Sequence, residues 1–166
     1  MTVEAPVRAY VGLGGNLGDV EETLLDALMA LDMIPQTTQR AHSRFYRNPA
    51  WGKTNQPDFV NAVAELHTRL TPRVLLDRLL AIEERFGRVR SEGEKWGPRE
   101  LDLDLLVYGD ESLDEPGLHL PHPYLHERAF VLVPLAEIAP DLVIPGRGKV
   151  RDLLATVDSS AVEALD

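Results

Sequence analysis

LDLDLLVY, at residues 101–108, decides the fold because its apolar and acidic residues alternate over a stretch of strand length. Period-two alternation predicts a β-strand with one buried face. The leucines at alternate positions would face a core, while Asp102 and Asp104 would share the opposite face, roughly 6.6 Å apart along the strand. That spacing suits a pair of hard cations in phosphoryl chemistry, and it equally suits an ordinary solvated strand face.

The sequence on both sides of this strand predicts the remaining elements. Strands are expected at 8–13, 41–47 and 59–67, helices at 20–32 and 72–86, a hairpin at 111–120 and a short helix at 124–130. The order strand, helix, strand, strand, helix, strand predicts an α+β domain of split βαβ units, with helices packed on one face of a mainly antiparallel sheet. No repeat or linker divides the sequence, so residues 1–166 are expected to form a single domain.

Composition limits the classes of function. Hydrophobic residues make up 44% of the 166 residues and the net charge is −10, which argues against a nucleic-acid or anionic-membrane surface led by clustered Lys and Arg. The sequence has no cysteine, so disulfides and thiolate metal sites are excluded. Met1 to Pro6 contains no basic region followed by an apolar run, and no stretch approaches the roughly 20 apolar residues of a membrane span. We therefore expect a cytoplasmic monomer.

A basic segment precedes the acidic strand. Five basic residues lie among residues 85–99, which carry a net charge of +3 once two glutamates are counted. Guanidinium groups bind phosphate oxygens in pairs, and basic residues leading into acidic ones are what a metal-bound triphosphate requires. The alternative is an exposed, highly charged loop. Trp96, within this segment, suits either a lid over a bound base or a hydrophobic plug.

The other motifs in the sequence are not specific enough to identify a known kind of binding or catalytic site. The glycine-rich stretch 12–18 is interpreted as a tight turn from strand to helix, because Leu17 occupies the last glycine position of a dinucleotide-binding motif and no Lys-Ser/Thr follows for a phosphate-binding loop. His122 and His126 have helical spacing, but Pro123 and the lack of a third paired ligand argue against zinc. No Ser-His-Asp set supports covalent catalysis.

KWGPRELDLDLL, at residues 95–106, resembles the signature of the 6-hydroxymethyl-7,8-dihydropterin pyrophosphokinase family. The resemblance extends over about residues 8 to 145. Further matching stretches are GLGGNLG at 12–18, FYR at 45–47, FVNA at 59–62, GRVR at 87–90, LPH at 120–122 and RAF at 128–130.

The resemblance implies a ferredoxin-like α+β fold and transfer of diphosphate from ATP to the hydroxymethyl group of a dihydropterin, with release of AMP, in folate biosynthesis. It implies two Mg²⁺ ions on Asp102 and Asp104. The catalytic residues that it implies are Arg88, Arg99, Asp102 and Asp104. The ATP contacts that it implies are Glu83, Arg88, Arg90, Trp96, Arg99, Leu105, His122 and Arg128. The pterin contacts that it implies are Asn48, Pro49, Ala50, Trp51, Phe59, Asn61 and Phe130.

The sequence departs from the family pattern at three positions that bear on substrate contacts. Gly117 stands where some members carry a nucleotide-contacting Arg, Leu80 where some have Gln, and Phe59 where some have Tyr. Two rival functions remain open at the level of sequence. One is a metal-dependent nucleotidyltransferase or phosphohydrolase with the same acidic pair, and the other is a small-ligand regulatory module on the same scaffold.

Overall fold

The computed structural model describes residues 2–49, 57–86 and 101–165. Its main elements in chain order are β1 (Thr2–Gly15), α1 (Val20–Asp32), β2 (Thr37–His42), β3 (Tyr46–Asn48), β4 (Phe59–Leu70), α2 (Pro72–Arg85) and β5 (Asp102–Tyr108). The remaining elements are β6 (Leu113–Glu115), β7 (Leu118–Leu120), the 3₁₀-helix η1 (Leu125–Glu127), α3 (Ala129–Ile138), β8 (Val143–Ile144), β9 (Gly148–Lys149), α4 (Val150–Leu154) and β10 (Glu163–Ala164).

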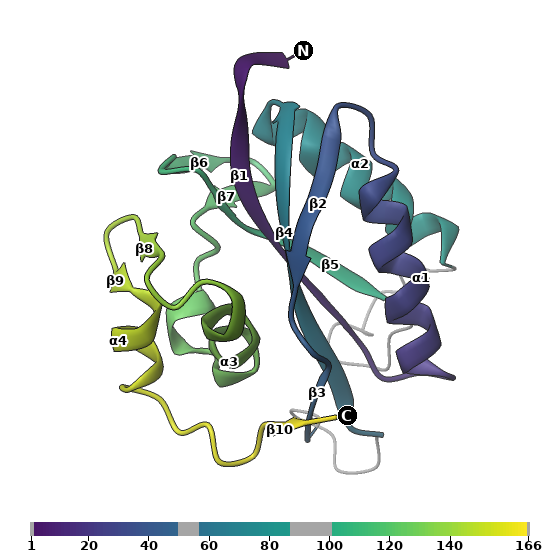
Figure 1. The fold of residues 1–166 in the computed structure, drawn as a ribbon, viewed down its shortest axis with the longest axis vertical. Helices are drawn as coiled ribbons and strands as arrows, with labels where there is room; N and C mark the ends of the chain where they lie inside the picture. Colours follow the sequence, from purple (N-terminus) through teal and green to yellow (C-terminus); the bar gives the residue numbers. More distant parts are fainter. Residues whose placement is uncertain (1, 50–56, 87–100, 166) are drawn as a thin grey trace.

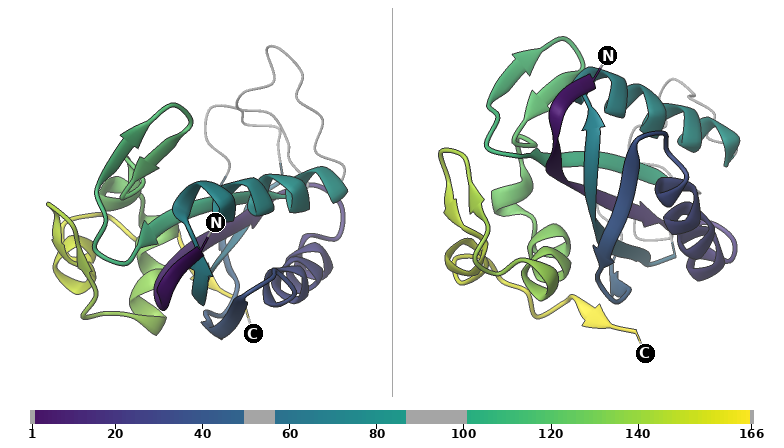
Figure 2. Two further views of the ribbon diagram at one scale, coloured as in Figure 1. Left: turned by 90° about the horizontal axis from the view of Figure 1, so that it is seen from above. Right: turned by 45° about the horizontal axis from the view of Figure 1, so that its top comes forward.

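A central antiparallel sheet carries the fold. Its strand order is β10-β3-β4-β1-β5, and β2 also pairs with β4. Helices α1 and α2 lie on one side of the sheet, whereas α3 and α4 lie on the other (Figures 1 and 2). The strand–helix–strand–strand–helix–strand order and the antiparallel sheet confirm the predicted ferredoxin-like α+β fold. The structure differs from the prediction in having a second layer of helices, α3 and α4, on the other face of the sheet.

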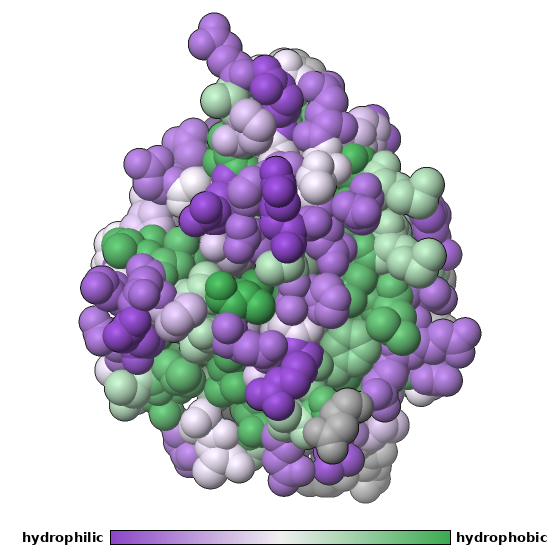
Figure 3. All heavy atoms as spheres, viewed as in Figure 1, coloured by the Kyte–Doolittle hydropathy of each residue, from purple (hydrophilic) through white to green (hydrophobic). Residues whose placement is uncertain are grey.

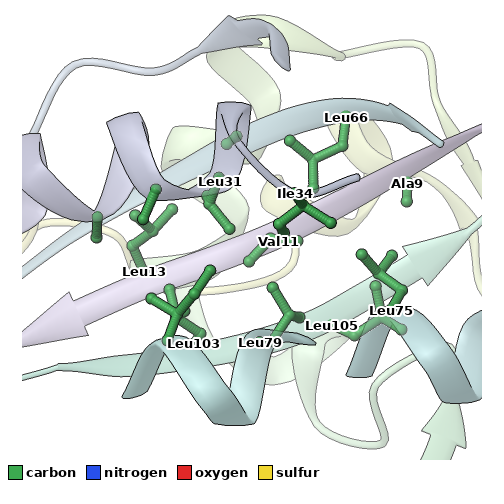
Figure 4. Packing of buried hydrophobic residues seen from close by; sticks show 14 of the residues in the cluster. Ala9, Val11, Leu13, Leu31, Ile34, Leu66, Leu75, Leu79, Leu103 and Leu105 are labelled. Carbon is green, nitrogen blue, oxygen red and sulfur yellow. The ribbon is translucent and has the colours of Figure 1, made fainter. Parts of the chain in front are cut away.

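The larger core fills the space between the sheet and helices α1 and α2. Leu13 and Leu103 from the sheet pack in one cluster with Leu31 of α1 and Leu79 of α2 (Figure 4). All four side chains are no more than 4% exposed. Because side chains alternate across a strand, burying these leucines turns the intervening residues of β1 and β5 to the other face.

The long helices begin where the sequence predicts, and their caps differ. Helix α1 starts after Asp19, whose Oδ1 accepts a hydrogen bond from the Glu22 backbone N–H at 3.3 Å. Helix α2 starts at Pro72, but Thr71 makes no side-chain capping bond. Proline at the first helical position is itself a start signal, because its missing N–H would be unpaired there anyway.

The strand expected at 41–47 is instead two strands separated at Ser43. Ser43 is 1% exposed, and its Oγ accepts the Val63 N–H at 3.0 Å and donates to the Arg44 carbonyl at 2.7 Å. The Ser43 backbone N–H also donates to the Val63 carbonyl. A side chain thus takes over ladder hydrogen bonds, so the chain can bend between β2 and β3 without leaving a buried group unsatisfied.

The short helix expected at 124–130 is wrong in extent. The segment forms η1 and then the first turn of α3, which continues to Ile138 and contains Pro134. Proline normally ends a helix, but Leu132, Pro134 and Leu135 are buried against the second core, together with Val63 and Leu106 of the sheet. Packing of α3 on the sheet outweighs the cost of the proline.

The surface is mixed in polarity. Among the described helices, none is long and apolar enough to cross a membrane. Leu25 and Met29 of α1 and Met33, which follows its last residue, lie four residues apart and are each more than half exposed. Figure 3 shows hydrophobic surface between hydrophilic residues along the side of the molecule where α1 lies.

Candidate active site

Strand pairing brings the predicted site residues onto one face of the sheet. Gly14 of β1 pairs with Asn61 of β4 on one side and with Asp102 of β5 on the other, and Asn61 pairs in turn with Tyr46 of β3. Residues paired directly across antiparallel strands point to the same face. The row therefore places Asn61 and Asp102 on one face with only a glycine between them.

The next row along the sheet adds the second aspartate. Gly12 pairs with Val63 and with Asp104. This face is the α3 side of the sheet, because Val63 belongs to the core cluster around α3. Asp104 is exposed and Asp102 is partly exposed, so both carboxylates are accessible to a ligand. The predicted alternation in β5 is confirmed.

Glu83 supports the strand that carries the two aspartates. It lies near the C-terminal end of α2, is 4% exposed, and its Oε2 accepts a hydrogen bond from the Leu103 backbone N–H at 2.7 Å. Strand β5 is at the edge of the sheet, where backbone groups facing away from the neighbouring strand need another partner. A carboxylate accepting a backbone N–H supplies a charge-assisted hydrogen bond. The segment Asp102–Leu103–Asp104 is therefore held from both sides.

Two asparagines form a polar pair beside the aspartates. The Asn61 Nδ2 donates to the Asn48 Oδ1, and the Asn48 Nδ2 donates to the Pro49 carbonyl at 3.2 Å. Asn48 is 6% and Asn61 is 9% exposed. A Cβ on Gly14 would lie 2.6 Å from the Asn61 Oδ1, which is closer than such atoms approach. The glycine at this position is required by the position of the Asn61 amide.

A second group of predicted residues lies around η1 and the start of α3. The guanidinium carbon of Arg128 is 5.6 Å from the centroid of the Phe130 ring and 5.3 Å from that of Tyr124. His122 donates its backbone N–H to the Leu106 carbonyl at 2.8 Å, which attaches this segment to β5. Burial of the His122 ring, followed by the charges of Arg128 and His119, lowers its pKa to about 4. His122 is therefore neutral near pH 7.

The remaining residues predicted to contact substrates lie in different parts of the fold. Phe59 begins β4, is partly exposed, and lies on the same face as Asn61 because the two are two residues apart. The Leu105 side chain is 5% exposed in the core beneath α1 and α2, so any contact it makes with a nucleotide falls to its backbone. Pro49 is exposed. The predicted residues Ala50, Trp51, Arg88, Arg90, Trp96 and Arg99 lie outside the described residues.

Some residues of this region lie in stretches that match the family but received no role from the sequence. Tyr46, 5% exposed, donates its hydroxyl to Glu137 Oε1 at 2.5 Å, and the Arg44 backbone N–H donates to the same carboxylate at 3.1 Å. These bonds fasten the C-terminal end of α3 to β3. Asn16, 1% exposed, donates its Nδ2 to the Pro57 carbonyl at 3.1 Å. Sequence periodicity could not predict these hydrogen bonds, because each joins residues at least 41 positions apart in the sequence.

The acidic pair fits magnesium better than a metal held by protein ligands alone. Within residues 2–49, 57–86 and 101–165, no group of three or more His, Cys, Asp or Glu side chains is arranged to hold a metal ion. Mg²⁺ binds through one or two carboxylates and completes its octahedron with water and substrate phosphates. Asp102, partly exposed, and Asp104, exposed, lie on one strand face and are compatible with that pattern of ligands.

Comparisons with known proteins agree with the family resemblance seen in the sequence. The sequence model of the family described as "7,8-dihydro-6-hydroxymethylpterin-pyrophosphokinase (HPPK)" matches residues 10–140. The 2-amino-4-hydroxy-6-hydroxymethyldihydropteridine pyrophosphokinase of Methylorubrum extorquens is 48% identical over 96% of this chain and 99% of its own length. The protein of the same name from Pseudomonas aeruginosa is 46% identical over 95% of this chain and 96% of its own length.

Solved structures share the fold at low identity. Wild-type HPPK-DHPS from Plasmodium falciparum superposes with a TM-score of 0.68 at 14% identity, over 90% of this chain and 41% of that one. The wild-type protein with pteroate gives 0.69 at 15% identity, over 93% and 43%. This chain thus spans less than half the length of those structures. At such identities the similarity establishes the fold alone.

Replacing Gly14 by Ala tests the close approach to Asn61. Because the added Cβ would meet the Asn61 Oδ1 at 2.6 Å, Gly14→Ala is expected to rotate Asn61 and break its bond to Asn48, with a loss of about 1 kcal/mol in the free energy of unfolding. The matched control is Gly12→Ala, whose Cβ would lie 3.5 Å from the Leu106 side chain, an ordinary contact. Urea unfolding and the Asn61 side-chain amide signal in NMR spectra distinguish the two. Equal effects of both variants would contradict the proposed clash.

The lowered pKa of His122 predicts a pH dependence of stability. The folded protein keeps His122 neutral down to about pH 4, whereas the unfolded chain protonates it near pH 6.5. Its contribution to the free energy of unfolding is therefore fully present above about pH 6.5 and is lost as the pH falls toward 4. His122→Gln should reduce the loss of stability between pH 7 and pH 4.5 by about 1–2 kcal/mol, allowing for partial exposure.

Urea titrations at several pH values measure this, and NMR titration of the His122 ring gives the pKa directly. His42→Gln, at an exposed histidine, is the control for the replacement of a histidine by glutamine. A His122 ring that titrates near pH 6.5 in the folded protein would refute the prediction.

Proposed function

This chain belongs to the 7,8-dihydro-6-hydroxymethylpterin-pyrophosphokinase family, and from that premise we propose that it transfers diphosphate from ATP to 6-hydroxymethyl-7,8-dihydropterin, in folate biosynthesis. The acceptor would be the hydroxymethyl oxygen, which bonds to the β-phosphorus as the α–β bridging bond breaks. AMP leaves and the hydroxyl proton passes to solvent. The observation that carries this proposal is the single sheet face shared by Asp102, Asp104 and Asn61.

For the pterin, we assign the polar contact to the pair Asn48 and Asn61. An amide presents both donors and an acceptor, which matches a heterocycle with alternating donors and acceptors. Phe59, on the same face as Asn61, and Phe130, at the start of α3, would pack on the flat ring. Backbone groups of residues 48–51 complete this proposed subsite.

For the nucleotide, we assign the phosphate contacts to arginines. Arg128, between η1 and α3, and His122, in the segment that precedes η1, are two of the proposed contacts, while Arg88, Arg90, Arg99 and Trp96 are proposed from the family resemblance. Neutral His122 would donate or accept one hydrogen bond without adding charge. Glu83 would act indirectly, by holding the Leu103 backbone between the two aspartates.

Asp102 and Asp104 are the proposed ligands of two Mg²⁺ ions. Magnesium would neutralise phosphate charge and help orient the ATP phosphates. The residues of this chain then have positioning and electrostatic roles, since phosphoryl transfer demands little covalent chemistry from a protein. The use of ATP is consistent with the cytoplasmic location expected from the sequence.

A product assay tests the proposed function directly. Protein, ATP, Mg²⁺ and 6-hydroxymethyl-7,8-dihydropterin are incubated, and AMP and the pterin diphosphate are quantified. We expect both products in equal amounts, and neither when the pterin is omitted. Release of pyrophosphate in place of AMP would identify a nucleotidyltransferase, and hydrolysis of ATP without pterin would identify a phosphohydrolase.

Substitution of the acidic pair tests the proposed metal ligands. Asp102→Asn and Asp104→Asn should each lower the rate of AMP formation by about 100-fold or more, because the amide removes the charge that holds the cation. The thermal unfolding midpoint of each variant is measured alongside, so that loss of the cation is distinguished from loss of the fold. Asp110→Asn, at an exposed carboxylate just beyond β5, is the matched control with wild-type rate. Full activity in both site variants would eliminate this assignment.

A further inference from the structure

Tyr124 lies beside the proposed nucleotide site and has no role assigned so far. It precedes η1, and its residue is 55% exposed. An exposed tyrosine ring of this size contributes little to the core, so its position needs another explanation. Its two neighbours in space are Arg128, 5.3 Å from the ring centroid, and His122, whose ring is 6.4 Å away in an edge-on arrangement.

The backbone of Arg128 is fixed by the junction between η1 and α3. Its N–H donates to the Leu125 carbonyl at 3.3 Å, and its carbonyl accepts the N–H groups of Val131 at 3.0 Å and Leu132 at 2.9 Å. The side chain, in contrast, has no ion pair or hydrogen bond among residues 2–49, 57–86 and 101–165. The guanidinium instead contacts two aromatic rings, and its central carbon lies 5.3 Å from the centroid of the Tyr124 ring and 5.6 Å from that of Phe130.

This arrangement orders a guanidinium without occupying its donors. A guanidinium resting on an aromatic face keeps its five N–H groups in its own plane, where they can reach a phosphate in pairs. An ion pair with a carboxylate would use the same donors. Ordering the side chain in advance also lowers the entropy lost when a ligand binds.

We propose that Tyr124 is a positioning residue, whose ring, together with Phe130, holds the Arg128 guanidinium in the orientation from which it binds the phosphates of ATP. The inference rests on the proposed function, which assigns Arg128 to the nucleotide. Tyr124 itself is placed by local contacts. Its backbone N–H donates to the His122 Nδ1 at 3.4 Å, and its carbonyl accepts the Glu127 N–H at 3.0 Å.

A double-mutant cycle on AMP formation tests the proposal. Tyr124→Ala should raise KM for ATP about two- to fivefold, the effect of one exposed cation–π contact, and should leave kcat and KM for the pterin unchanged. Tyr124→Phe, which keeps the ring, should retain the wild-type KM for ATP. Arg128→Ala should raise KM for ATP further, and Tyr124→Ala combined with Arg128→Ala should be no worse than Arg128→Ala alone.

Other outcomes overturn the inference while leaving the proposed function to its own test. Additive effects in the double variant would mean that Tyr124 contacts the nucleotide itself rather than acting through Arg128. An unchanged KM in Tyr124→Ala, or in Arg128→Ala, would also refute the positioning role. In each of these cases, pterin-dependent AMP formation by the wild type would still establish the reaction, and its absence would reject the proposed function instead.

Discussion

The site depends on the antiparallel pairing of β1 with both β4 and β5 through its glycine-rich end. That register sets Asn61 and Asp102 on either side of Gly14, and Val63 and Asp104 on either side of Gly12. A side chain at Gly14 would fill the space that the Asn61 amide occupies. A one-residue slip would turn both aspartates into the core beneath α1 and α2 and bring leucines to the site. The core leucines of β5 therefore fix the face that carries the proposed site as firmly as they fix the fold.

The two layers of helices have different roles around this sheet. Helices α1 and α2 bury the apolar side of β1 and β5, and α2 also supplies Glu83 to the edge of the strand that carries the aspartates. Helix α3 packs on the opposite face of the sheet, and Arg128 and Phe130 lie next to each other at the start of this helix. Its far end is tied to β3 through Glu137 and Tyr46.

Sequence patterns predicted what depends on period and punctuation. The alternation in 101–108 predicted β5 and the common face of Asp102 and Asp104, and the apolar stripe of 20–32 predicted α1 with its observed ends. The patterns failed where a distant partner decides the local structure. Ser43 divides a predicted strand because it bonds to Val63, and Pro134 is accepted inside α3 because its neighbours are buried on the sheet. The glycines at 12, 14 and 15 lie within β1 rather than in a turn, and of these Gly14 is required by the Asn61 amide of the neighbouring strand β4. Roles of individual residues came from the family resemblance, and spacing alone could not assign them.

The electrostatics of the two halves of the site differ in kind. On the sheet, the proposed metal ligands are two carboxylates on one face of β5 in a protein of net charge −10, a setting that would attract a cation. On the helical side, Arg128 is held by aromatic rings rather than by a carboxylate, and His122 is kept neutral beside it. Positive charge there is thus left uncompensated by the neighbouring side chains described. A polyphosphate with bound magnesium presents both a cation to the aspartates and anionic oxygens to the arginine, and it matches both halves at once. Neither a free anion nor a free cation would match both halves, which supports the proposed metal-bound nucleotide.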